Sequence, residues 1–204
     1  MEKRKDVLLD VDDVICFSGF IEAINEFMGT DYKMDDFSVY YIDEVAIPKE
    51  RFNDFSKFIR GRNFYDNAHI LPNAIETIGS LSEIYNIYPC SSCINPFDVE
   101  EPGDAWKNKF EFLRRVLPFI KPENIIFTSS KHLIKTDIQI DDRISNLNDY
   151  AETKILFPSY HNRNIPDEEL KKQNIIRAGY DWKTGWKEVE DILIKNPKKY
   201  TLKK

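Results

Sequence analysis

The stretch DVLLDVDDVICFSGF, residues 6–20, decides the fold that we predict for this chain of 204 residues. It begins with a short, apolar and β-branched run, residues 6–11, which indicates a strand covered on both faces. Three carboxylates, Asp10, Asp12 and Asp13, end this run. Because a buried acid is costly unless a positive group lies beside it, the pattern indicates either an exposed strand edge or a site that holds a cation.

Outward from this stretch, strand patterns alternate with amphipathic helical patterns. The helical patterns cover residues 18–29, 48–61, 72–84, 104–117 and 186–196. The strand patterns cover residues 6–11, 85–90, 123–128, 136–142, 153–159 and 174–178. Such alternation predicts an α/β protein with a mainly parallel sheet. Residues 17–71 interrupt it, so we expect a small, mostly helical cap there, inserted into a core made of residues 1–16 and 72–204.

Composition and charge exclude several classes of protein. Hydrophobic residues make up 42% of the chain, which is typical of a globular protein and not of a disordered one. The net charge of −6 gives no general attraction to a nucleic acid polymer. The sequence has no apolar run of about 18 residues, so we expect no membrane span. The apolar stretch after the basic start MEKRKDVLLDV is too short for a signal peptide, and we expect a cytoplasmic protein.

The three cysteines, Cys16, Cys90 and Cys93, are too few for a disulfide framework and favour a reducing setting. Cys90 and Cys93 form a C-x-x-C pattern, for which a redox motif or half of a zinc site are the functional interpretations. We favour ordinary buried thiols, because the sequence offers few further zinc ligands.

Polar side chains follow three of the predicted strands. They are Asp10 and Asp12, Ser91 and Ser92, and Asp141 and Asp142. In open α/β sheets, ligands bind at the carboxyl ends of the strands. Alternation along an extended strand places Asp10 and Asp12 on one side and turns Asp13 away. If the two acidic strands are neighbours, four carboxylates converge and repel each other unless a hard divalent cation such as Mg²⁺ binds among them.

Four segments together resemble the motifs of the haloacid dehalogenase (HAD) phosphatase superfamily. LLDVDDV resembles the first motif, an apolar strand followed by D-x-D-x-[TV], and YPCSS supplies the serine of the second. Lys109 suits the lysine of the third motif, and IQIDD matches the fourth, a strand that ends in two acids. The motifs occur in the family's order and span residues 6 to 142.

Within this superfamily, the chain is most similar to the 5'(3')-deoxyribonucleotidase family. The similar stretches are HILPNAIETIGSLSEIYNIYPCSS, KFEFLRRVLPFIKPENIIFTSSKHLIKTDIQIDDRISNL and GWKEVEDIL. The resemblance implies a Rossmann-like core with helices on both faces of the sheet. It also implies a Mg²⁺-dependent phosphomonoesterase that releases nucleoside and phosphate from (deoxy)nucleoside monophosphates. We expect it to act as a monomer or homodimer.

The resemblance implies a role for each acid. Asp10 is expected to be the nucleophile that forms an aspartyl-phosphate. Asp12 is expected to protonate the leaving oxygen and then to deprotonate the attacking water. Mg²⁺ is expected to bind Asp10, the backbone carbonyl of Asp12, and Asp142, with Asp141 acting through water or from a second layer.

The resemblance also implies which groups hold the phosphate. Ser91 and Lys109 are expected to bind the transferring phosphoryl oxygens, and Ser92 and Lys131 match weaker phosphate-binding positions. The pattern alone favours a solvated helix lysine for Lys109, and only the family spacing reverses that interpretation.

The cap shows little pattern that can be aligned with the family. Its aromatic side chains are candidates for stacking on a base or sugar, or for the cap's own small core. They are Phe17, Phe20, Tyr40 and Tyr41, together with Phe64 and Tyr65. Asp13 stands where glycine is common in the family. The histidines carry no motif, and His132, beside Lys131, is the only one that we expect near the site.

Three other functions stay open. A phosphatase of the same mechanism could act on another small metabolite, such as a sugar phosphate or a cofactor precursor. A non-enzymatic, phosphate-binding protein on a degenerate HAD fold is disfavoured by the intact acids. An end-processing enzyme acting on nucleic acid is disfavoured because the chain is acidic and has no basic stripe.

Overall fold

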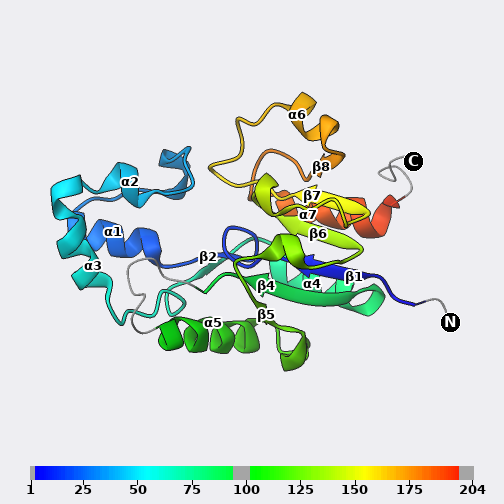
Figure 1. Cartoon of the computed structure of the whole chain (residues 1–204), viewed down its shortest axis with the longest axis horizontal. Coiled ribbons are helices and arrows are strands. Elements are labelled where there is room, and N and C mark those ends of the chain that lie inside the picture. Colours follow the sequence, from blue (N-terminus) through cyan, green and yellow to red (C-terminus); the bar gives the residue numbers. More distant parts are fainter. Residues whose placement is uncertain (1–2, 94–101, 198–204) are drawn as a thin grey trace.

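The computed structural model describes residues 3–93 and 102–197, and Figure 1 shows their arrangement. A six-stranded sheet forms the centre of the core, in the order β5-β4-β1-β6-β7-β8, and each pairing in it is parallel. Its strands are β1 (Asp6–Leu9), β4 (Asn86–Ser91), β5 (Ile126–Phe127), β6 (Ile138–Asp141), β7 (Thr153–Leu156) and β8 (Ile175–Arg177). The predicted α/β class with a mainly parallel sheet is confirmed.

Helices connect and cover these strands. The α-helices are α1 (Phe20–Met28), α2 (Asp43–Ala46), α3 (Phe52–Ile59), α4 (Ala74–Ile84), α5 (Pro102–Val116), α6 (Asp167–Lys172) and α7 (Gly185–Glu190). Short 3₁₀ helices span Met34–Asp36, Lys49–Arg51, Pro122–Asn124, Lys131–Leu133 and Ile144–Asn146, and a π-helical turn spans Asp191–Lys195. In the part of the chain that the structure describes, none of these helices has the length and apolar character needed to cross a bilayer.

The central strands are covered on both faces. Val7, Leu8 and Leu9 are consecutive in β1, and all three are buried. Consecutive side chains of a strand point to opposite faces, so elements must pack on each side of the sheet. The closing helix α7 packs beside α4, and the indole Nε1 of buried Trp186 donates a 2.8 Å hydrogen bond to the carbonyl of Val14. The end of the chain is thereby fixed to the loop that follows β1.

The strand register brings three strand ends to one edge of the sheet. Leu9 in β1 pairs with Pro89 in β4 and with Ile140 in β6. The backbone N–H of Asp10 continues this ladder with a 3.0 Å hydrogen bond to the carbonyl of Ile140. Residues that follow β1, β4 and β6 therefore leave the sheet at the same level, as the sequence predicted for its acidic strand ends.

A short antiparallel pair separates a helical segment from this core. Strands β2 (Cys16–Phe17) and β3 (His69–Ile70) pair with each other and not with the central sheet. The segment between them contains α1, α2 and α3, which lie together at one end of the molecule in Figure 1. Buried Ile24, Phe55 and Ile59 form part of its own packing. We call the pair β2–β3 the neck.

Candidate active site

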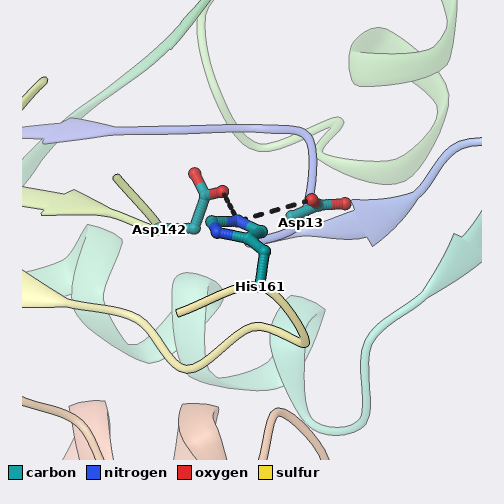
Figure 2. Close-up of side chains that lie close together, drawn as sticks. All are labelled: Asp13, Asp142 and His161. Atoms are coloured by element: carbon teal, nitrogen blue, oxygen red, sulfur yellow. Dashed lines mark hydrogen bonds and ion pairs between the residues drawn. The ribbon is translucent and has the colours of Figure 1, made fainter. Parts of the chain in front are cut away.

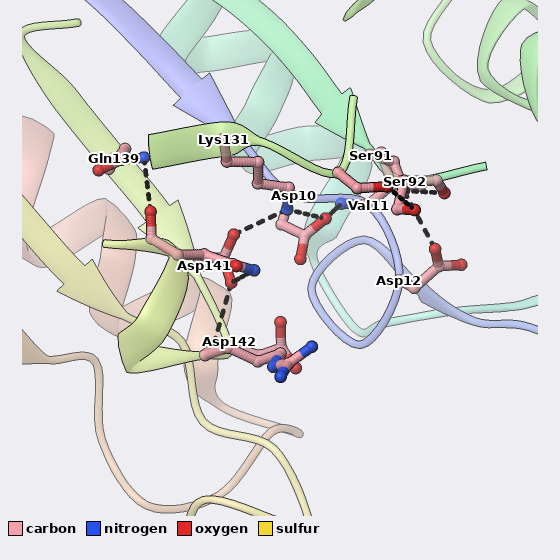
Figure 3. A network of polar contacts seen from close by, with 12 residues as sticks. Asp10, Val11, Asp12, Ser91, Ser92, Lys131, Gln139, Asp141 and Asp142 are labelled. Atoms are coloured by element: carbon pink, nitrogen blue, oxygen red, sulfur yellow. Dashed lines mark hydrogen bonds and ion pairs between the residues drawn. The ribbon is translucent and has the colours of Figure 1, made fainter. Parts of the chain in front are cut away.

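The side chains predicted to carry chemistry converge at the carboxyl edge of the sheet, as Figure 3 shows for most of them. They come from the ends of β1, β4 and β6, from α5 and from the 3₁₀ helix that begins at Lys131. A cavity of about 550 Å³ opens there between the core and the segment beyond the neck. The predicted side chains that line it are Asp10, Asp12, Ser91, Ser92, Lys109 and Lys131.

Three carboxylates form an acidic cluster at the base of this site. Asp10, Asp141 and Asp142 are all buried, and one oxygen from each lies within 4.8 Å of the others. Burial and the nearby Asp141 raise the pKa of Asp10 to about 6, although Lys131 acts in the opposite direction. Burial, Asp141 and Asp10 also raise the pKa of Asp142. A cluster of carboxylate oxygens that repel one another suits a hard divalent cation such as Mg²⁺ or Mn²⁺.

Lys131 bridges two members of the acidic cluster. Its Nζ lies 2.6 Å from Oδ1 of Asp10 and 2.8 Å from Oδ2 of Asp141. Burial would lower the pKa of this ammonium group, but the two carboxylates outweigh that effect and raise it. Lys131 is therefore a fixed positive charge beside Asp10.

Lys109 binds a different carboxylate. Its Nζ donates to Oδ2 of Asp12 at 2.7 Å, to Oγ of Ser91 at 2.8 Å and to the carbonyl of Ser92 at 2.6 Å. The family resemblance gave Lys109 the stronger and Lys131 the weaker phosphate-binding position. The structure places both lysines at the cavity, and Lys131 is the one that contacts Asp10.

Side chains from the core and from the segment beyond the neck donate hydrogen bonds to the carboxylate of Asp12. Its Oδ2 accepts hydrogen bonds from Lys109 and from Oγ of Ser91 at 3.2 Å, and its Oδ1 accepts one from the hydroxyl of Tyr65 at 2.6 Å. Burial alone would raise the pKa of Asp12, but Lys109, Tyr65 and Ser91 outweigh burial and lower it. The sequence suggested Tyr65 only as one of several cap aromatics, because nothing in its pattern indicates a contact with Asp12.

The two acids of β6 have different partners. Asp141 accepts bonds on Oδ1 from the backbone N–H of Arg143 at 3.0 Å and from Nδ2 of Asn146 at 2.9 Å, while its Oδ2 binds Lys131. Asp142 instead contacts Nε2 of His161 through Oδ2 at 2.6 Å. Protein donors therefore occupy both oxygens of Asp141, whereas Asp142 belongs to two groups of possible ligands, one with Asp10 and Asp141 and one with Asp13 and His161.

Asp13 departs from the sequence expectation. The rule of strand alternation turned it away from the site, but it lines the cavity, and its Oδ2 lies 3.8 Å from Nε2 of His161. The expectation was wrong because Asp13 has φ of 60°, in the left-handed region, so the chain turns there and alternation no longer applies. Burial and the charge of Asp12 raise the pKa of Asp13 to about 8.

His161 was missed by the sequence analysis. We expected His132 to be the only histidine near the site, but His132 is exposed and His161 is the one that contacts Asp142. His161 follows β7, which pairs with β6. The rule that polar residues after neighbouring strands share one edge would have indicated it, had we extended that rule to the strand at 153–159.

The predicted substrate aromatics separate into two groups. Phe20, Tyr40 and Tyr41 line the cavity. Phe17 does not, because it belongs to the neck and is buried edge-on against the rings of Tyr160 and Trp182, with centroid distances of 6.1 and 5.0 Å.

The cysteines have no assigned role in this chemistry, although Cys93 lines the cavity. Cys16, Cys90 and Cys93 are free and buried. Burial raises the pKa of the Cys90 thiol to about 12 and that of Cys93 to about 11. Both thiols of the C-x-x-C pattern are therefore protonated at neutral pH, as expected of buried structural cysteines.

Comparisons with known proteins show which proteins this chain is similar to. A family model described as "5' nucleotidase, deoxy (Pyrimidine), cytosolic type C protein" matches residues 4–198. A putative 5'(3')-deoxyribonucleotidase from Staphylococcus aureus strain Mu50 is 27% identical over 198 residues, which cover 96% of this chain and 99% of that protein. The 5'(3')-deoxyribonucleotidase of Bacillus subtilis strain 168 is 27% identical over 195 residues, or 94% and 99% of the two chains. Among solved structures, a haloacid dehalogenase-like hydrolase from Streptococcus pneumoniae aligns with a TM-score of 0.42 and 13% identity, over 71% of this chain and 78% of that one.

Proposed function

Because the chain belongs to the cytosolic type C family of deoxy (pyrimidine) 5'-nucleotidases and is thus a phosphoric monoester hydrolase, we propose that it hydrolyses (deoxy)nucleoside monophosphates through an aspartyl-phosphate on Asp10. The resemblance to 5'(3')-deoxyribonucleotidases that the motifs indicated is confirmed. The names of the relatives support the nucleotide as substrate.

The proposed mechanism depends on how the carboxylate of Asp10 is held. Its Oδ1 accepts a 2.7 Å hydrogen bond from the backbone N–H of Val11 and a 2.6 Å contact from Nζ of Lys131. Two donors on one oxygen fix the orientation of the carboxylate at the cavity and present Oδ2 for attack on phosphorus. With a pKa of about 6, Asp10 is mostly ionised at neutral pH, as a nucleophile must be.

The reaction then takes two steps. Asp10 attacks phosphorus while Asp12 protonates the leaving oxygen, which releases the nucleoside and leaves an aspartyl-phosphate. Asp12 next removes a proton from a water molecule, which attacks phosphorus and releases phosphate. Ser91, Ser92, Lys109 and Lys131 hold the phosphoryl oxygens, where negative charge concentrates.

The contact with Lys109 makes the protonation of Asp12 depend on whether substrate is bound. In the free protein, the ammonium group of Lys109 stabilises the carboxylate of Asp12. An incoming phosphate dianion competes for Lys109 and adds negative charge near Asp12. Both effects favour a proton on Asp12, which it needs as general acid.

The acidic cluster is the proposed cation site. Asp10, Asp142 and the backbone carbonyl of Asp12 would hold Mg²⁺, which neutralises phosphoryl charge when it is bound. Asp141 would support the site from a second layer, since its oxygens already accept bonds from Lys131, Arg143 and Asn146.

We also propose that residues 17–71 are the cap and that residues 1–16 and 72–204 are the catalytic core. The neck divides the chain close to these bounds, and Phe20, Tyr40 and Tyr41 of the cap line the cavity. The cap would then select the nucleoside. A cytoplasmic location agrees with the three free thiols and with the word "cytosolic" in the family description, and the monomer or homodimer stays a prediction.

A phosphatase screen with Mg²⁺ tests the proposal. It compares deoxyribonucleotides, ribonucleotides, sugar phosphates and cofactor phosphates, with the wild-type protein, Asp10→Asn, and the exposed cap variant Asp54→Asn as control. Nucleoside monophosphates should be the best substrates. Asp10→Asn should lose at least about 1,000-fold in kcat, since removing a nucleophile costs that much or more, while its circular dichroism spectrum stays unchanged.

Two results would contradict the proposal. Turnover by Asp10→Asn close to that of Asp54→Asn would exclude the covalent step. A clear preference for sugar or cofactor phosphates would favour the alternative phosphatase of the same mechanism.

A further inference from the structure

A buried histidine contacts the carboxylate that is proposed to bind the cation. Nε2 of His161 lies 2.6 Å from Oδ2 of Asp142, and their side chains are only 8% and 2% exposed. Figure 2 shows the ring between Asp142 and Asp13, whose Oδ2 lies 3.8 Å from the same nitrogen. When Asp142 is ionised, as a cation ligand is, it offers only acceptor oxygens, and Nε2 of His161 then carries the hydrogen of this short bond.

The surroundings hold the imidazole of His161 in this orientation. The rings of Tyr40 and Tyr160 meet it edge-on, with centroid distances of 5.1 and 5.2 Å. The next residue, Asn162, donates through Nδ2 to the carbonyls of Asp142 at 2.8 Å and Phe157 at 2.7 Å. The loop after β7 is thereby fixed to the end of β6, and this holds His161 beside Asp142.

We propose that His161 is a positioning residue for the cation ligand Asp142. Its Nε2–H donates to Oδ2 and so fixes the rotation of the carboxylate, which directs the other oxygen toward Asp10 and the cation position. This inference rests on the Mg²⁺-dependent function proposed above. Groups that orient a metal ligand typically change metal affinity by about 10- to 100-fold when they are removed.

The contact distance favours a hydrogen bond over a second cation between His161, Asp142 and Asp13. A cation bound by His161 and Asp142 at about 2.1 Å from each atom would hold those atoms farther apart than 2.6 Å. His161 therefore acts on the cation through Asp142 and does not bind one itself.

Mg²⁺ titrations followed by the melting temperature test this role without any need for turnover. His161→Ala and His161→Phe both remove the donor, and the second keeps a ring in the slot between the tyrosines. His161→Gln places an amide N–H near the position of Nε2. The control is His69→Ala, which removes an exposed histidine on β3.

The two donor-free variants should need about 10- to 100-fold more Mg²⁺ for half of the stabilisation, and His161→Gln should stay within about threefold of wild type. The Mg²⁺ concentration for half-maximal activity should shift in parallel, while kcat at saturating Mg²⁺ changes little. His69→Ala should match wild type. The Ala and Phe variants control for each other, because a loss that came only from the ring packing would appear in Ala and not in Phe.

Other outcomes distinguish a failure of the proposed role of His161 from a failure of the proposed cation site. Unchanged Mg²⁺ midpoints in Ala and Phe, with a wild type that responds to Mg²⁺, would overturn the role of His161 alone. A wild type that does not respond to Mg²⁺ would overturn the proposed cation site. Two Mn²⁺ ions bound per wild-type chain and one per His161→Ala chain would also overturn the positioning role, because His161 would then be a ligand.

Discussion

The hydroxyl of Tyr65 lies 2.6 Å from Oδ1 of Asp12, so a side chain from beyond the neck bonds directly to the proposed general acid of the core. Nζ of Lys109 binds the other oxygen of the same carboxylate. The position of the cap and the protonation of Asp12 are therefore coupled through one hydrogen bond.

Tyr65→Phe should shift the pH profile of kcat. Because the lost hydroxyl stabilised the carboxylate of Asp12, the pKa of Asp12 should rise. Asp12 must be protonated to act as general acid, so the alkaline limb of kcat should move to higher pH. Steady-state rates across the pH range measure this. Tyr32→Phe, another cap tyrosine, is the control, and identical alkaline limbs for both variants would exclude the coupling.

Lys131→Met should destabilise the metal-free protein. The change leaves Asp10 and Asp141 buried without their shared cation, which typically costs about 3–5 kcal/mol in the free energy of unfolding. The loss should be smaller at pH 5 than at pH 8, because Asp10, with its pKa already raised to about 6, takes up a proton at the lower pH. Urea unfolding with EDTA at both pH values measures it.

The control for Lys131→Met is Lys135→Met, which removes an exposed lysine from the same loop. A loss of equal size in the two variants would show that Lys131 does not neutralise the buried acids.

Mg²⁺ should stabilise the protein more at pH 8 than at pH 5. The raised pKa of Asp10 means that the folded, metal-free protein binds this proton more tightly than the unfolded chain does, so the contribution of Asp10 to stability falls as the pH rises from about 4 to about 6. At pH 5, Mg²⁺ must displace the proton of Asp10, whereas at pH 8 Asp10 has already lost that proton. Melting temperatures measured with Mg²⁺ and with EDTA, at pH 5 and at pH 8, give the stabilisation by Mg²⁺ at each pH.

Asp142→Asn should abolish most of this response, and Asp149→Asn, which changes an acid with a 99% exposed side chain, should keep it. An Mg²⁺ effect of the same size at both pH values would contradict binding at the acidic cluster.

Tyr41→Ala should weaken nucleotide binding without changing the chemistry. Tyr41 lines the cavity and is exposed, and loss of stacking on a base costs about 1–3 kcal/mol, or about 5- to 150-fold in KM. The KM for p-nitrophenyl phosphate, which has no nucleoside, should stay within about twofold. Val45→Ala, an exposed cap residue, is the control. Equal changes for both substrates would exclude a role of Tyr41 in nucleoside selection.

The parts of the fold that follow from repetitive local patterns could be predicted from the sequence. Apolar runs that end in polar groups located β1, β4 and β6, and the rule for strand ends brought Asp10, Ser91 and Asp141 to one edge. Helical spacing located α1 and α4 because their apolar faces span several turns.

The features that could not be predicted from the sequence depend on contacts between distant segments or on single backbone angles. The four-residue helix α2 is too short to show a period, and the pairing of β2 with β3 joins residues about fifty positions apart. The direction of Asp13 depends on a single left-handed φ angle, and the position of His161 depends on which strand lies beside β6. The partners of Lys109 and Lys131 depend on how side chains from different elements meet, which spacing along the chain does not determine.

The neck holds the two ends of the helical segment beside each other. Cys16 pairs with Ile70 and Phe17 with His69, so the chain leaves and re-enters the core through neighbouring strands. A foreign insert whose two ends meet could join this junction, provided that it also replaces the bonds that Asp35 and Phe37 make with Arg163 and Trp182 of the core. A chimera built in this way would keep the phosphate chemistry and acquire new selectivity, provided that the graft supplies a donor in place of the hydroxyl of Tyr65.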